Sequence, residues 1–127
     1  MSLQTKIQRV GSALVAGLTV IPEGQETGEL VCDVWHYWRP QMQAPFVVWA
    51  EDGEQNPAAN ADDRKAEQAI TGYVDYYTKT EYDNTADLIQ DALFGLQAEV
   101  PFVWRLDSVQ YEDDTNLIHY QWTWTVS

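Results

Sequence analysis

The segment "LIHYQWTWTV", residues 117–126, alternates between large apolar and polar side chains. The apolar positions are Ile118, Tyr120, Trp122, Trp124 and Val126. Successive side chains of a β-strand point to opposite faces, so this spacing predicts a strand with one apolar face that helices can cover. Both tryptophans are therefore expected in the core. Two alternatives would give the same pattern. The aromatic side chains could form a platform for a ligand such as a sugar, or a surface that contacts another subunit.

Residues 3–18 have the period of an amphipathic helix. Apolar or small residues recur there at intervals of three and four: Ile7, Val10, Gly11, Leu14, Val15 and Leu18. This spacing gathers them on one helix face. Lys6 and Arg9 fall outside that face in this prediction.

A second helix is predicted over 83–97. Its apolar stripe consists of Leu88, Ile89, Ala92, Leu93 and Leu96. Asp83 or Asn84 can cap its first turn, and Asp87 lies where the helix dipole favours a negative charge.

Segments rich in β-branched and aromatic residues predict strands at 30–38, 45–52 and 69–79. Residues 102–126 predict a hairpin that turns at "EDDTN", residues 112–116. The polar stretch at about 52–68 predicts a long loop or arm.

These elements predict a single α+β domain over residues 1–127. We expect a mainly antiparallel sheet packed on one face by two helices, in the order α-β-β-β-α-β-β.

The net charge of −13 limits the classes of partner. The seven basic residues are scattered: Lys6, Arg9, Arg39, Arg64, Lys65, Lys79 and Arg105. Proteins that grip DNA cluster such residues against phosphates, so specific nucleic-acid binding is not expected. The acidic charge instead serves solubility, a basic partner, or a surface that repels DNA. No apolar run reaches the about 18–20 residues that span a bilayer, so no membrane partner is expected.

The residues do not predict an enzyme, a metal site or a cofactor. Paired carboxylates can hydrolyse glycosides, but the acids here fall in predicted turns and loops. His36 and His119 are isolated within strands, without the spacing of metal ligands. Cys32 is the only cysteine and has no catalytic signature around it, so we expect a small buried side chain.

Several phrases in this order resemble a known family. These are "APFVVWAEDGE", a polar loop ending in "ADDRKAEQ", "ITGYVDYYTKTEYD", the helix "NTADLIQDAL" and the finish "SVQYEDDTNLIHYQWTWTV". Together they resemble the minor tail proteins of long-tailed bacteriophages, in particular the tail terminators. The resemblance implies a structural subunit whose hexameric ring caps the tail tube and stops its polymerisation. It also implies binding to the tube protein and the head–tail connector, with double-stranded DNA passing through the lumen unbound, and a location in the virion tail after assembly in the host cytoplasm.

Two sets of residues are candidates for this role. The candidates for contact with a neighbouring subunit or the tube are Asp52, Gly53, Glu54, Gln55, Asn56, Asp62, Asp63 and Arg64. The candidates for acids that face the lumen are Glu51, Glu54, Asp113 and Asp114. The alternatives are a small carbohydrate- or peptide-binding module that uses surface Trp and Tyr, or another head–tail joining protein.

Overall fold

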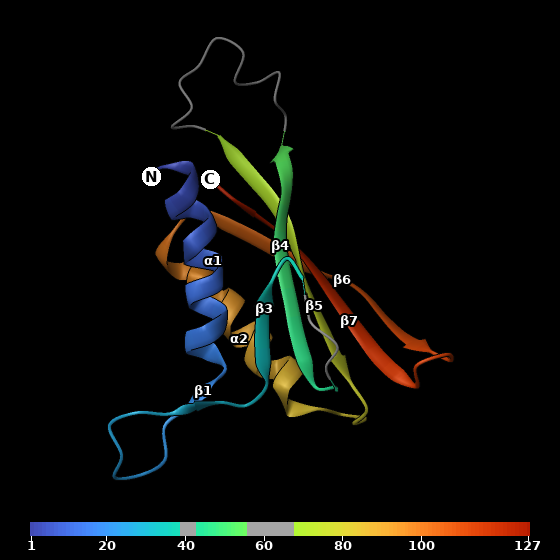
Figure 1. Cartoon of the computed structure of the whole chain (residues 1–127). Helices are drawn as coiled ribbons and strands as arrows, with labels where there is room; N and C mark the ends of the chain where they lie inside the picture. The colour runs from blue at the N-terminus through green and yellow to red at the C-terminus, as the bar shows by residue number, and fades with distance from the viewer. Residues whose placement is uncertain (39–42, 56–67) are drawn as a thin grey trace.

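The computed structural model describes residues 1–38, 43–55 and 68–127. They form two layers, in which α1 and α2 pack together against one face of a five-stranded sheet (Figure 1). Neither described helix lies on the other face, which we call the open face. This confirms the predicted α+β class, the mainly antiparallel sheet and the order of its elements.

Both helices begin at a side-chain cap. α1 spans Leu3–Gly17, and the Ser2 hydroxyl accepts a hydrogen bond from the Thr5 amide at 3.1 Å. α2 spans Asn84–Glu99, and its cap is Asp83, one of the two predicted candidates. The cap side chains satisfy backbone N–H groups that have no partner within the helix.

The strands are β1 (Thr19–Val20), β2 (Glu29–Leu30), β3 (Asp33–His36), β4 (Phe46–Gln55), β5 (Ala69–Thr78), β6 (Phe102–Glu112) and β7 (Leu117–Val126). The large sheet has the order β3-β4-β5-β7-β6, and β1 pairs with β2 in a separate ribbon. Within the large sheet, β3 and β4 are parallel, and the pairs β4–β5, β5–β7 and β7–β6 are antiparallel. The predicted turn joins β6 to β7, where Asn116 has a φ of 58°, a left-handed conformation that asparagine tolerates.

The core lies between the helices and the predicted apolar face of β7. Trp122 and Trp124 are 1% and 2% exposed, which confirms the core interpretation of both. The Trp122 Nε1–H donates to Gln90 Oε1 of α2 at 3.1 Å, so its polar end is satisfied inside the core.

The prediction for α1 was wrong at two positions. Lys6 is buried, and its Nζ donates to the backbone oxygen of Gln68 at 2.6 Å, whereas Val15 is exposed. The buried side of the helix is therefore rotated toward Lys6. A lysine stem can cover apolar surface while its ammonium group reaches a carbonyl, which hydrophobic periodicity does not reveal.

Two strand boundaries also differ from the predictions. The strand predicted over 30–38 is reduced to β3, because Leu30 pairs with Thr19 in the small ribbon instead. The polar arm was predicted to begin at Asp52, but β4 continues to Gln55. A bulge between Glu51 and Gly53 accommodates the extra residue, so the ladder to β5 resumes beyond it.

Candidate functional site

The open face carries a hydrogen-bonded group of charged and polar side chains from three strands. His119 Nε2 donates to Asp75 Oδ1 at 2.6 Å, and the Gln121 amide donates to the same oxygen at 3.0 Å. Glu112 Oε2 lies 3.5 Å from His119 Nδ1. We call Asp75, Glu112, His119 and Gln121 the open-face cluster. It joins β5, β7 and β6.

Aromatic rings shield one side of this cluster. The Tyr77 ring stacks on the His119 ring with 4.2 Å between centroids, and Phe46 of β4 stacks on Tyr77 at 4.8 Å. Partly buried charges require partners, and here each charged group has one. Both ring nitrogens of His119 face carboxylates, so neither is free to act as a base on a substrate. The cluster therefore fixes the relative positions of the strands.

His119 makes stability depend on pH. Its hydrogen bond to Asp75 raises the pKa of His119 above the ordinary 6.5; burial opposes this, and the charges of Asp75 and Glu112 add to it. A raised folded-state pKa gives stability that is fully present below the unfolded pKa and is lost as pH rises through the folded value. We expect urea unfolding to show the wild-type chain losing stability over this interval and His119→Gln losing less. Equal losses in the two chains would contradict this role for His119.

A second group lies where β3 ends beside β4. Glu51 accepts from His36 Nε2 at 2.8 Å and from the Tyr37 hydroxyl at 2.8 Å. The His36 ring stacks between Trp49 and Tyr37, with centroid distances of 3.9 and 3.8 Å. Tyr37 has a φ of 74°, a conformation that a bulky residue rarely adopts, and these contacts hold it there. This is the structural role of His36.

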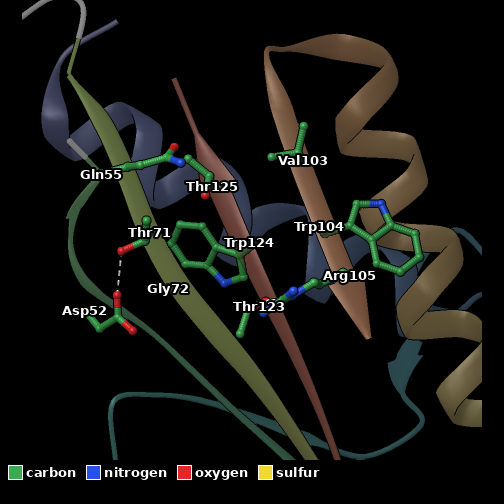
Figure 2. Close-up of a pocket in the computed structure, with 10 residues that line it drawn as sticks. All are labelled: Asp52, Gln55, Thr71, Gly72, Val103, Trp104, Arg105, Thr123, Trp124 and Thr125. Carbon is green, nitrogen blue, oxygen red and sulfur yellow. Dashed lines mark hydrogen bonds between the residues drawn. The ribbon is translucent and has the colours of Figure 1, made fainter. Parts of the chain in front are cut away.

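A groove of about 520 Å³ crosses the open face over β4, β5, β7 and β6 (Figure 2). Its polar lining includes Asp52, Gln55, Thr71, Arg105, Thr123 and Thr125. The Thr71 hydroxyl donates to Asp52 Oδ1 at 2.7 Å, as Figure 2 shows. Arg105 extends along the strands, 3.2 Å from Asp107 Oδ1 and 3.4 Å from Thr123 Oγ1. Hydroxyl, amide and carboxylate groups of this kind suit hydrogen bonding to another polar surface.

The predicted contact residues fall into three places. Asp52 and Gln55 line the groove, with Gly53 between them in β4. The pairing of Glu54 with Ile70, a core residue, places its side chain toward the helix layer. The other candidates, Asn56, Asp62, Asp63 and Arg64, lie outside the described residues.

The predicted lumen acids do not form one surface within the subunit. Glu54 pairs near the end of the sheet that holds Ile70 and Val126, while Asp113 and Asp114 lie in the β6–β7 turn at the other end. Glu51 is held by His36 and Tyr37 as described above. An acidic lumen would therefore have to combine acids from different subunits.

No three His, Cys, Asp or Glu side chains within the described ranges converge to hold a metal ion. In the open-face cluster the two carboxylates lie on different nitrogens of one imidazole, so they do not face a common point. Burial raises the pKa of the Cys32 thiol to about 12, with the negative charges of Asp33 and Asp83 adding to the effect. This keeps the thiol protonated and poorly nucleophilic.

Comparison with protein-family models gives no match to the chain, and comparison with curated proteins gives none either. Neither helix in the described part of the chain is long and apolar enough to cross a membrane.

Proposed function

We propose that this protein is a structural subunit of a long-tailed bacteriophage tail, a tail terminator whose ring caps the tail tube and joins it to the head. The observation that carries the proposal is the order of the main elements, α-β-β-β-α-β-β in a two-layer fold, because the sequence resemblance rests on that order. Its partners would be further copies of the chain, the tube protein and the connector. Assembly in the host cytoplasm would place it in the virion tail.

The charge of the chain supports passage of DNA without binding. The net charge is −13, and among the described basic residues Lys6 is buried against Gln68. Arg9, Lys79 and Arg105 lie on different parts of the fold, so the described residues gather no basic patch. An acidic surface without basic patches repels DNA phosphates, so a duplex could pass through the lumen of the ring without being bound.

The place where the chain leaves the sheet supports a contact between subunits. Residues 56–67 follow Gln55, the last residue of β4, and Gln55 lines the open-face groove together with Asp52. A head-to-tail contact that closes after six copies forms a ring, and such a contact needs a surface distinct from its partner surface. We assign residues 52–68 to one side of that contact.

Native mass spectrometry over a range of protein concentrations tests this assignment. We expect a discrete hexamer for the wild-type chain and loss of the hexamer when residues 57–66 are replaced by a glycine–serine linker. The matched control replaces Glu23–Glu26, an exposed segment between β1 and β2, in the same way and should keep the hexamer. Circular dichroism should show folded subunits in all three cases. A hexamer that survives the first replacement contradicts the assignment of this segment.

The carbohydrate- or peptide-binding alternative receives less support from the tryptophans. Of the six tryptophans only Trp38 is largely exposed, at 66%, whereas Trp49, Trp122 and Trp124 are buried. Stacking on a sugar needs exposed rings. A monomer at every concentration, together with binding in a glycan screen, would favour this alternative over the ring.

A further inference from the structure

β6 forms one edge of the large sheet. Among the described strands it pairs only with β7, so the backbone groups of its outer side have no strand partner. A bulge between Leu106 and Ser108 divides the edge into two parts. The part from Ser108 to Glu112 is as long as a typical strand in a sheet. Open edges of this kind are where another chain can add a strand.

Exposed apolar side chains accompany this edge. Leu106, Val109 and Tyr111 are 44%, 50% and 59% exposed. Their pairing with Trp122, Tyr120 and Ile118 places them on the same side of the sheet as the core. Figure 1 shows that the β6–β7 hairpin continues past the end of the helix layer, so no described helix covers the part near its turn. Leu106 lies nearer to α2, with which it lines a hollow. All three side chains would line one side of an added strand.

Negative charge lies near these apolar side chains. Asp107, Asp113 and Asp114 are exposed along the edge and its turn. Glu112 ends the edge on the open face, where it is half-buried beside His119. Asp87 of α2 borders a hollow of about 310 Å³ that Leu106, Tyr120 and Tyr82 also line. The basic residue of β6, Arg105, is already paired with Asp107.

We propose that the β6 edge from Ser108 to Glu112, with Leu106, Val109 and Tyr111 beside it, binds an extended basic segment of another protein as an added strand. Backbone hydrogen bonds would hold the segment, alternate apolar side chains would cover Val109 and Tyr111, and lysine or arginine would meet the acids. The proposal does not depend on the ring.

Charge selects this partner over a second copy of the same chain. Two copies meeting at this edge would bring two sets of the same acids together. Like charges that face each other across an interface repel and disfavour the pairing. A basic segment turns the same acids into a source of attraction and specificity.

A pair of synthetic peptides tests the proposal, one alternating lysine and valine and one with the same composition in two blocks. Fluorescence anisotropy with the full chain should give a dissociation constant at least about tenfold lower for the alternating peptide, because only it matches the two faces of an added strand. Binding should weaken as salt rises from about 50 to about 300 mM. With the peptide bound, amide hydrogen exchange should slow within Ser108–Glu112.

Two valine-to-lysine variants on the same strand separate the edge from overall charge. Val109→Lys should weaken binding of the alternating peptide at least about tenfold, since it removes an apolar contact and adds repulsion. Val103→Lys adds the same charge at another exposed position, on the open face beyond the bulge, and should change binding by less than about twofold. Both variants should keep the wild-type melting temperature.

Three results would overturn the proposal. Equal binding of the two peptides would mean that charge alone attracts them. Equal losses of peptide affinity in the two variants would show that the β6 edge is not part of the binding site. Sedimentation that shows a wild-type dimer dissolved by Val109→Lys would assign the edge to a second copy of this chain.

Discussion

Gly72→Ala is expected to lower the free energy of unfolding by about 3 kcal/mol, the upper part of the range for overpacking a core. Gly72 lies in β5, paired with Glu51 of β4 on one side and Trp124 of β7 on the other. A Cβ atom at this position would overlap the Trp124 ring and the backbone oxygen of Ala50. Neither can move easily, because the indole is buried and the oxygen belongs to the neighbouring strand.

Two other glycines are matched controls for this substitution. In Gly53→Ala, also within the β4–β5 hairpin, the new Cβ would lie 3.8 Å from Thr71 Oγ1, an ordinary contact, so we expect little change. In Gly95→Ala the Cβ meets nothing within 4 Å, and a helix interior gains about 0.5–1 kcal/mol from this change. Urea unfolding followed by tryptophan fluorescence measures all three. A Gly72→Ala chain as stable as Gly53→Ala would show that the ring of Trp124 relaxes freely.

The sequence predicted this packing in part. Alternation in residues 117–126 indicated that Trp124 points into the core, since one face of a half-buried strand is apolar. Which residue lies opposite Trp124 depends on the register between β5 and β7, and that register joins positions far apart in the chain. No local sequence pattern predicts this register, so the contact between Gly72 and Trp124 is seen only in the structure.

The same distinction applies to the charged groups. Alternation in residues 117–126 placed His119 on the polar face of a predicted strand, which is correct, but gave no reason to pair it with Asp75. Lys6 was missed for a similar reason, because its partner is the backbone of Gln68 across the fold. Sequence patterns predicted best the features that depend on residues close together in the chain, such as the cap at Asp83 and the turn before β7.

The candidate site was predictable only in outline. Composition indicated a polar segment near 52–68, but the acids and Gly53 suggested a loop where a bulged strand continues to Gln55. The β6 edge was not anticipated, since Val109 and Tyr111 read as part of an ordinary hairpin. They are exposed because the β6–β7 hairpin extends beyond the helices. This depends on the relative lengths of the packed elements, which the sequence of the strand alone does not show.

Asp83→Ala is expected to lower the free energy of unfolding by about 2–4 kcal/mol, since it removes a helix cap and leaves buried hydroxyl groups without an acceptor. Asp83 Oδ1 accepts from the Thr85 amide at 2.9 Å. Its Oδ2 accepts from the hydroxyls of Tyr76 and Thr78, each at 2.6 Å. Tyr76 and Thr78 are buried, so water does not replace the lost acceptor. Asp83→Asn keeps one oxygen and should lose less stability.

The carboxylate also makes the cap sensitive to acid. Burial alone would raise the pKa of Asp83, but the hydrogen bonds from Thr78, Tyr76 and Thr85 together lower it below the ordinary 3.8. A lowered folded-state pKa gives stability that is present above the unfolded pKa and is lost as pH falls through the folded value. Burial and the bond to Asp83 raise the pKa of Tyr76, so its hydroxyl remains a donor throughout this range.

Urea unfolding of the wild-type chain and Asp83→Asn at neutral pH and near pH 3 separates the cap from its charge. The difference in stability between the two chains should shrink toward acid, because the Asp83 carboxyl of the unfolded wild-type chain, with its ordinary pKa of 3.8, binds a proton there and the amide of the variant does not. Thr85→Ser keeps the backbone donor and the Asp83 charge, and should follow the wild-type pH dependence. If the difference in unfolding free energy between wild type and Asp83→Asn stayed constant with pH, the negative charge of Asp83 would not contribute to the stability of this cap.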